Sequence, residues 1–276
     1  MTPAYLGFND SLSPWQQMAA DEAMLDGPPA FRLYDYPHDA VVFGRNQHPS
    51  ILKGTYPAAR RFTGGTATIE KRGDLRWAIS LPYEFRSLKD MNQYLCRLLT
   101  ASLENAGIRN AYADPEMSTV KLHGKIIGGY ARCVKGETGF AHGMIAMTPY
   151  STRSAVSAIW LRRGEEHLLS STPSLSKAMM KEPEEAREAL MKSMLNVMAA
   201  AGLNIMNIRE LIESPDYVTA LQKHLYPPWI IHGISSPNVP DPGILVVDEE
   251  GIRHLLNKKG HCFYSMYTDE QLAALR

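Results

Sequence analysis

Two glycine-containing segments carry the residues best suited to chemistry. The first, residues 60–68, reads RRFTGGTAT. Its adjacent Gly64 and Gly65 permit a tight turn whose backbone amides can approach a ligand beside the Arg61 guanidinium, and such a loop suits an anion. The alternative is an ordinary glycine turn flanked by surface arginines, because a Gly-Gly pair without a P-loop lysine is a weak signal.

The second segment, residues 124–131, reads GKIIGGYA and places Lys125 before apolar strand residues and the Gly128-Gly129 pair. A lysine there can hold a phosphate or polarise a carbonyl oxygen as a compact charge. The alternative is a solvated strand lysine next to a bulge. The two segments are more informative together, because activating a carboxylate with a nucleotide needs both an amide-rich anion loop and a separate cation.

A cysteine and a histidine offer a different chemistry. Cys133 stands nine positions before His142, so a Cys/His arrangement that carries an acyl group as a thioester is geometrically possible. The alternative is a half-buried thiol at the end of a strand. Three residues near the C-terminus match no zinc-ligand spacing and do not predict a metal site: His254, His261 and Cys262.

Helices and strands that alternate along the chain must position these residues. Apolar spacing and capping signals predict helices over 14–26, 88–106, 151–161 and 184–201, and a last helix capped by Thr268. Alternation and turn residues predict strands over 31–34, 40–43, 76–81, 119–131 around a His123-Gly124 turn, 140–147 and 244–247. This order is typical of an α+β fold.

The composition limits the class of protein. The 276 residues, 45% hydrophobic and 21% charged, suit one large domain with a small appendage. We place the main domain at 1–232 and a proline-rich C-terminal appendage at 233–276. Twenty-nine basic residues balance 29 acidic ones, which disfavours nucleic acid as the main ligand.

The targeting signals and the cysteines indicate the compartment. We find no basic and apolar leader typical of secretion and no run of about 18 apolar residues that would span a membrane. The three cysteines are far apart and odd in number, which argues against a disulfide framework. We therefore expect a cytoplasmic protein without a membrane partner.

Five motifs occur together in one order along the chain: Asp21-Glu22-Ala23, Gly44-Arg45-Asn46-Gln47, Arg60 to Gly65, Lys125-Ile126-Ile127-Gly128 and His142-Gly143. In order and spacing this set resembles the lipoate–protein ligase A family over about residues 5–230. The resemblance implies a mixed β-sheet flanked by helices, with the ligand in a tunnel over the sheet. It also implies two reaction steps, in which ATP activates lipoate or octanoate as an acyl-adenylate and a lysine of a lipoyl carrier domain then takes the acyl group.

The resemblance also implies roles for individual residues. Lys125 would contact the acyl carbonyl and the α-phosphate, and Mg²⁺ would screen the phosphates. The expected ligand-binding set is Arg61, Thr63, Gly64, Gly65, Thr66, Gly128, Gly129 and His142. Asp114 is the candidate metal ligand, because family members carry an Asn-Asp pair before the lysine hairpin and this chain reads Asp114 to Thr119 there.

The chain departs from the family pattern at further positions. Thr66 stands where a third glycine is usual, and Glu70-Lys71 stands where His-Asp is usual. These changes leave two alternatives open, a transferase that uses Cys133 as a thioester carrier and a non-catalytic lipoyl-binding protein. The segment after His232 is too short and too proline-rich to match the family's accessory domain, so a separate accessory subunit is a further expected partner.

Overall fold

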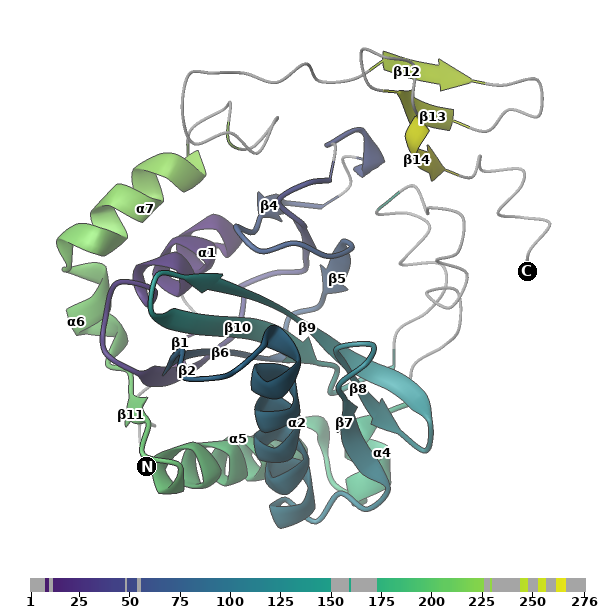
Figure 1. The fold of residues 1–276 in the computed structure, drawn as a ribbon. Helices are drawn as coiled ribbons and strands as arrows, with labels where there is room; N and C mark the ends of the chain where they lie inside the picture. The colour runs from purple at the N-terminus through teal and green to yellow at the C-terminus, as the bar shows by residue number, and fades with distance from the viewer. Residues whose placement is uncertain are drawn as a thin grey trace.

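A large mixed β-sheet with helices on both faces forms the centre of the fold (Figure 1). The structure is a computed structural model that describes residues 8–9, 12–47, 49–53, 56–149, 159, 173–225, 229, 244–247, 253–256 and 262–266. Its elements are β1 (Phe8–Asn9), α1 (Pro14–Ala23), β2 (Ala30–Tyr34), β3 (Ala40–Phe43), the 3₁₀ helix η1 (Pro49–Ile51), β4 (Ala58–Arg60), β5 (Thr68–Glu70), β6 (Leu75–Pro82), α2 (Leu88–Asn105), β7 (Ala111–Asp114), β8 (Thr119–Leu122), β9 (Lys125–Lys135), β10 (Thr138–Ile145), α4 (Leu175–Met179), α5 (Pro183–Ala200), β11 (Asn204–Ile205), α6 (Ile208–Ile212), α7 (Pro215–Leu225), β12 (Ile244–Val247), β13 (Arg253–Leu256) and β14 (Cys262–Met266).

Eight of the described strands form the main sheet in the order β1-β2-β6-β10-β9-β8-β7, with β11 also pairing with β2. β1 and β11 run parallel to β2, and the other neighbours are antiparallel. A second sheet, β4-β3-β5, carries the glycine loop 61–67 between β4 and β5. The expected mixed sheet flanked by helices is therefore confirmed.

Two glycines bring the long central strands close together. A side chain at Gly143 would collide with the Gly129 carbonyl oxygen and the Tyr130 Cβ atom, and one at Gly128 would collide with the Met144 carbonyl oxygen. Both glycines lie in the pairing of β9 with β10. Their lack of a side chain therefore sets the approach of these strands, whereas Gly129 has open space, with its nearest contact at 3.6 Å.

The two faces of the sheet are covered by different helices (Figure 1). α2 and α5 pack on one face, where the predicted helical stripe of Met91, Leu95 and Leu99 is buried with the inward residues of β6. α1, α6 and α7 pack toward the other face, in a second core that includes Phe140 and Ala78. Because successive residues of a strand point to opposite faces, His142 lies on the α1 side with Phe140.

α1 begins as the sequence predicts and is joined to α7 by a charged cluster. The Ser13 amide donates to Gln16 Oε1 at 2.9 Å, which completes the expected capping interaction. At the other end of the helix, the Glu22 carboxylate accepts from Lys223 Nζ at 2.6 Å and lies 2.9 Å from His224 Nε2. Glu22 therefore fixes α7 against α1.

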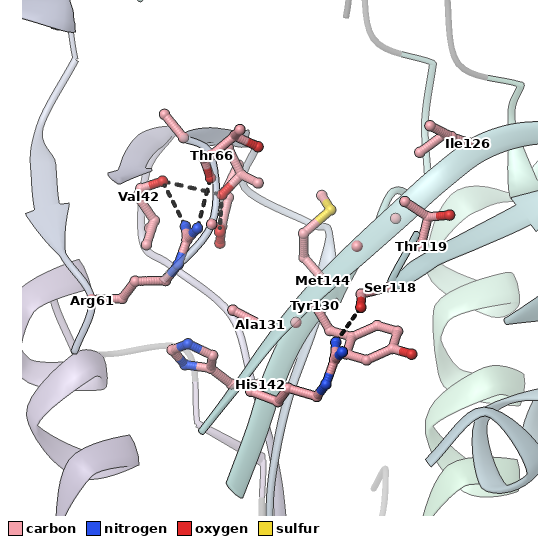
Figure 2. Close-up of a pocket in the computed structure, with 18 of the residues that line it drawn as sticks. Val42, Arg61, Thr66, Ser118, Thr119, Ile126, Tyr130, Ala131, His142 and Met144 are labelled. Carbon is pink, nitrogen blue, oxygen red and sulfur yellow. Dashed lines mark hydrogen bonds between the residues drawn. The ribbon is translucent and has the colours of Figure 1, made fainter. Parts of the chain in front are cut away.

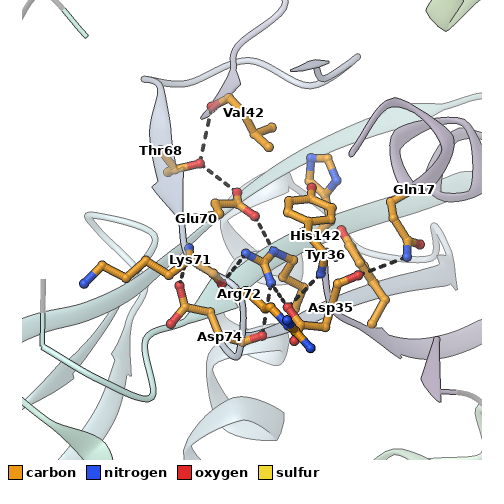
Figure 3. A network of polar contacts seen from close by, with 12 residues as sticks. Gln17, Asp35, Tyr36, Val42, Thr68, Glu70, Lys71, Arg72, Asp74 and His142 are labelled. Atoms are coloured by element: carbon orange, nitrogen blue, oxygen red, sulfur yellow. Dashed lines mark hydrogen bonds and ion pairs between the residues drawn. The ribbon is translucent and has the colours of Figure 1, made fainter. Parts of the chain in front are cut away.

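A buried ion network joins the two sheets to α5, and Figure 3 shows its part around Asp35, Glu70 and Asp74. Arg76 on β6 bonds Glu70 on β5 at 2.7 Å and Asp35 after β2 at 2.5 Å, and its side chain has no solvent exposure. Arg187 on α5 reaches the second Asp35 oxygen at 2.9 Å. The guanidinium of Arg76 also lies 4.0 Å from the Tyr36 ring centre. Arg76 is therefore the central charge of this network.

Several sequence expectations can be compared with the elements. The hairpin turn at His123-Gly124 is confirmed, since both residues have positive φ, 51° and 75°. The strand at 244–247 is confirmed as β12, which pairs with β13 in a sheet of its own. The helix from Thr268 lies outside the described residues, as does most of the helix expected at 151–161, where Ile159 forms an isolated bridge with Leu52 instead. The domain boundary at 232 stays a prediction.

The sequence did not predict the short strands β4, β5 and β7, each of three or four residues. It also did not predict β1, β11, β13 and β14 or the helices α4, α6 and α7. None of the helices in the described parts of the chain combines the length and the apolar character required to cross a membrane.

Replacing Arg76 by methionine should lower the free energy of unfolding by about 3–5 kcal/mol, because it leaves buried carboxylates without their partner. Urea unfolding followed by circular dichroism measures this change. The matched control is Lys135→Met, which removes an ion pair to Asp26 whose side chains are 55% and 49% exposed and should cost less than about 1 kcal/mol. Equal midpoint shifts in the two variants would show that the Arg76 network does not hold the sheets together.

Candidate functional site

A cavity of about 620 Å³ lies between the glycine loop and the hairpin side of the main sheet (Figure 2). Its volume is in the range of small-molecule sites, and most of its lining is apolar. In Figure 2, Arg61, Thr66 and His142 lie on one side of the view, and Ser118, Thr119 and Ile126 lie on the other. Strand β9 contributes the continuous stretch 126–132 to the lining.

Arg61 braces the glycine loop from within. Its Nε donates to the Gly64 carbonyl at 2.9 Å, Nη1 to Val42 at 3.2 Å and Nη2 to Thr66 at 2.7 Å. Burial lowers the pKa of Arg61 to about 10, so the guanidinium stays charged at neutral pH. Gly65 has a φ of 95°, a left-handed conformation that favours glycine. The arginine thus shapes the loop and leaves the loop amides as donors.

Arg60 braces the neighbouring turn in the same way. Its Nη1 donates to the carbonyl oxygens of Arg45 at 2.6 Å and Gln47 at 2.7 Å. Gly44 in that turn allows close approach, because a side chain there would collide with the Gly65 carbonyl. The Gly44-to-Gln47 motif is therefore part of the support of the glycine loop.

A chain of three buried polar side chains runs behind the loop. Thr63 Oγ1 lies 2.6 Å from His142 Nε2, and His142 Nδ1 lies 2.7 Å from Asp21 Oδ2. The same carboxylate accepts from Tyr34 Oη at 2.9 Å and from Arg32 Nε at 3.0 Å. His142 and Tyr34 line the cavity, whereas Thr63 is 1% exposed and lies just behind it. The loop, the sheet and α1 are thus linked through one carboxylate.

The opposite wall holds an arginine that sequence reasoning missed. Arg132 on β9 donates through Nη1 to Ser118 Oγ, while its buried Nε has no hydrogen-bond partner among the described residues. The buried Thr119 hydroxyl is also without a described partner. Both residues line the cavity. Buried polar atoms without partners are uncommon, so these two residues of the wall retain hydrogen-bonding capacity that no described contact uses.

Tyr130 anchors this wall to α2. Its hydroxyl donates to Asn92 Oδ1 at 2.6 Å and lies 3.1 Å from Cys96 Sγ. Burial raises the pKa of Tyr130 far above its usual value, so the phenol stays protonated. Cys96 is buried in the core next to it.

Lys125 stands at the first position of β9, directly after the hairpin turn. Its side chain is exposed and is not among the lining side chains, whereas the next residue, Ile126, lines the cavity. The expected site residues on the glycine loop, β9 and β10 converge on one cavity: Arg61, Gly64, Gly65, Thr66, Gly128, Gly129 and His142. Lys125 lies beside this group and Thr63 lies behind it.

Asp114 has contacts that serve a turn. Its Oδ1 accepts from the amides of Glu116 at 2.9 Å and Met117 at 3.3 Å, and its Oδ2 bonds Lys121 Nζ at 2.6 Å. The hydrogen bond from Lys121 lowers the pKa of Asp114. Within the described ranges, no three His, Cys, Asp or Glu side chains cluster in a way that could hold a metal ion. The Asp114 carboxylate is therefore engaged by the turn and by Lys121, and its role as a metal ligand stays a prediction.

Glu70, which replaces the histidine usual in the family motif, lines the cavity with its carboxylate engaged by Arg76 and by Thr68 Oγ1 at 2.8 Å. This acid is thus part of the network that holds the sheets. Cys133 lies outside the cavity lining, and burial raises the pKa of its thiol to about 11. Neither its position nor its protonation favours a thioester carrier.

A family model and solved structures both relate the chain to lipoate protein ligases. Residues 13–204 match the family described as the lipoyl protein ligase A/B catalytic domain. The fold is similar to that of a bi-partite lipoate protein ligase from Thermoplasma acidophilum, with a TM-score of 0.66, 16% identity, and coverage of 84% of this chain and 98% of that one. No curated protein sequence matches the chain.

Two further structures have a similar fold. Lipoate-protein ligase A bound with ATP matches with a TM-score of 0.63 and 15% identity over 83% of this chain and 99% of that chain. A P. falciparum protein in complex with lipoate matches with a TM-score of 0.63 and 12% identity over 91% of this chain and 79% of that chain.

Alkylation of Cys133 by iodoacetamide should be slow at pH 8 and should rise with pH toward 11, because only the thiolate reacts and its pKa is raised to about 11. At pH 8 the rate should be about 100-fold below that of a small-molecule thiol of ordinary pKa. Mass spectrometry of the Cys133 peptide measures the rate, with glutathione in the same tube as the reference. Fast labelling at pH 7 would show an activated thiol.

Proposed function

The chain belongs to the family of lipoyl protein ligase A/B catalytic domains, and we propose that it is an ATP-dependent, AMP-forming lipoate–protein ligase. In the first step, ATP activates lipoate or octanoate as the acyl-adenylate and pyrophosphate leaves. In the second step, a lysine of a lipoyl carrier domain takes the acyl group. The cavity residues support this proposal in three places.

The observation that carries the proposal is a mostly apolar cavity with unused polar groups on one wall. An aliphatic acid gains about 0.8 kcal/mol for each CH₂ group that it buries, and it then needs a cation for its carboxylate. Arg132 and Thr119 line this cavity, and their buried Nε and Oγ1 atoms have no described partner. We infer that they receive the acyl carboxylate.

The glycine loop is the second support. Arg61 is occupied by loop carbonyls, so we assign the phosphate contacts to the amides around Gly64 and Gly65, with Arg61 supplying charge from behind. Thr66 is exposed on the same loop. Glu70 is already neutralised by Arg76, so this acid does not oppose the phosphates as a free charge.

Lys125 is the third support. A lysine side chain is long and flexible, and from the start of β9 it can fold toward the acyl carbonyl and the α-phosphate once the ligand is bound. There it would stabilise the charge that develops in the transition state. Magnesium that accompanies ATP would keep phosphate and water ligands.

The acceptor and the partner are the remaining parts of the proposal. The T. acidophilum relative is a bi-partite ligase studied with its E2 lipoyl domain. By analogy we propose a lipoyl domain as the acceptor and a separate accessory subunit as the second component. The non-catalytic alternative differs in one measurable property, because a pocket that only binds lipoate forms no adenylate.

Lys125→Ala should reduce lipoate-dependent exchange of labelled pyrophosphate into ATP by about 10²–10³-fold, the usual effect of removing one charge-stabilising donor. Octanoate and biotin run in parallel establish which acid is used. The matched control is Lys135→Ala at the other end of β9, an exposed lysine paired with Asp26, which should exchange at the wild-type rate. Wild-type exchange by the Lys125 variant would remove the proposed role of this lysine.

Arg132→Gln should raise the KM for lipoate by about 10–100-fold, because it removes a charged hydrogen bond to the carboxylate. The same exchange assay measures it over a range of lipoate concentrations. Arg97→Gln is the control, since Arg97 is exposed on α2 and lies outside the cavity lining. An unchanged KM in the Arg132 variant would place the carboxylate elsewhere.

A further inference from the structure

The turn 115–118, which joins β7 to β8, ends at a serine with an unusual backbone conformation. Ser118 has a φ of 53°, in the left-handed region that residues other than glycine seldom adopt. Such a conformation persists only where the surrounding contacts hold it, and residues of this kind are concentrated at functional sites. Ser118 lines the cavity, so the contacts that hold it bear directly on the candidate site.

Contacts from three elements hold the turn in this form. At the end of β7, the Asp114 carboxylate accepts from two amides of the turn. Asn92 on α2 donates through Nδ2 to the Pro115 carbonyl. The Ser118 carbonyl accepts from the Tyr130 amide of β9 at 3.0 Å. The position of Ser118 is therefore fixed relative to both α2 and the sheet.

The Ser118 hydroxyl contacts the arginine of the same cavity wall. Nη1 of Arg132 donates to Ser118 Oγ, whereas Arg132 Nε has no partner among the residues that the structure describes. An arginine side chain has several rotatable bonds, and holding it in one conformation costs side-chain entropy. A contact that fixes the guanidinium in advance lowers this cost when a ligand binds.

We propose that Ser118 is a positioning residue that holds the Arg132 guanidinium in place for the acyl carboxylate. The inference rests on the proposed function, in which Arg132 receives that carboxylate. The left-handed backbone lets one residue direct its carbonyl to Tyr130 and its hydroxyl to Arg132. Because Ser118 acts through Arg132, losing its hydroxyl should weaken binding of the acid and leave the chemical step unchanged.

Two substitutions separate the hydroxyl from the backbone conformation. Ser118→Ala and Ser118→Gly both remove the hydroxyl, but only glycine adopts a positive φ without steric cost. We expect a lower thermal midpoint, followed by circular dichroism, for the alanine variant than for the glycine variant. Both variants should raise the KM for lipoate by about 10-fold in pyrophosphate exchange, the size expected for a hydrogen bond to a charged group. The kcat and the KM for ATP should stay at wild-type values.

A double-mutant cycle tests whether Ser118 acts through Arg132. Arg132→Met keeps a long unbranched side chain but has no donor, so the serine hydroxyl has no guanidinium to hold. In this background Ser118→Ala should change the KM for lipoate by less than about 2-fold, because residues that no longer interact give additive effects with a near-zero remainder.

A serine on α5 provides the matched control. The buried Ser193 hydroxyl donates to the Ser102 carbonyl at 2.6 Å, and Ser193 is not among the lining residues of the cavity. Ser193→Ala should lower the thermal midpoint, because it leaves a buried carbonyl without this donor. Its KM for lipoate should equal that of the wild-type protein.

The possible outcomes are distinguishable. A raised KM in Ser118→Ala with a wild-type KM in Ser118→Gly overturns the proposal, because the backbone conformation and not the hydroxyl would then matter. Wild-type KM values in both variants overturn it as well. An equal effect of Ser118→Ala in the wild-type and Arg132→Met backgrounds also overturns it, since the serine would then act independently of the arginine.

In each of these cases the wild-type protein still exchanges pyrophosphate, so the ligase proposal stands. Absence of lipoate-dependent exchange in the wild-type protein contradicts the ligase proposal itself and this inference with it.

Discussion

The assembly of the cavity depends on one buried carboxylate, that of Asp21. A buried charge is costly unless it is paired and hydrogen-bonded, and Asp21 has no solvent exposure. Arg32, Tyr34 and His142 together satisfy it from two strands of the sheet. His142 in turn contacts Thr63. These hydrogen bonds can all form only when α1, the sheet and the glycine loop lie in one arrangement relative to one another.

The two arginines at the glycine loop show that the sequence gives the position of a charge along the chain but not the partner that the charge contacts. Arg61 was expected beside an anion, and its guanidinium, like that of Arg60, instead donates to the carbonyl oxygens of a turn. Turns with several carbonyls pointing inward need such donors, because buried acceptors are rarely left unpaired. The loop therefore offers amides, and the cation with an unused nitrogen stands across the cavity, at Arg132.

Sequence patterns predicted the long elements well, because burial imposes a regular period. The stripe on α2 and the His123-Gly124 hairpin are confirmed. Strands β4 and β5 are too short for an alternation of buried and exposed side chains to be recognised in the sequence. Only their pairing with β3 defines them as strands. In the same way, Arg132 sits among strand residues, and only the three-dimensional pairing reveals that its Nε is unpaired.

The family motifs correctly predicted many of the residues that line the cavity. They did not predict the contacts of each of these residues. Asp114 was expected at a metal, and its carboxylate closes a turn and pairs with Lys121. Gly128 was expected to contact a ligand, and the space where its side chain would stand is taken by the Met144 carbonyl. Residue type limits the possible contacts, whereas neighbours brought in from distant segments decide between them.

Asp21 and Glu22 are consecutive on α1, and this adjacency has a mechanical consequence. Neighbouring helix residues point about 100° apart, so Asp21 faces the sheet while Glu22 holds Lys223 and His224 of α7. Binding of a molecule that displaces α7 must break the contacts of Glu22 with Lys223 and His224. Because Glu22 follows Asp21 in the same helical turn, such a displacement also acts on the backbone that positions Asp21 against His142. α1 thus connects α7 to the histidine in the cavity.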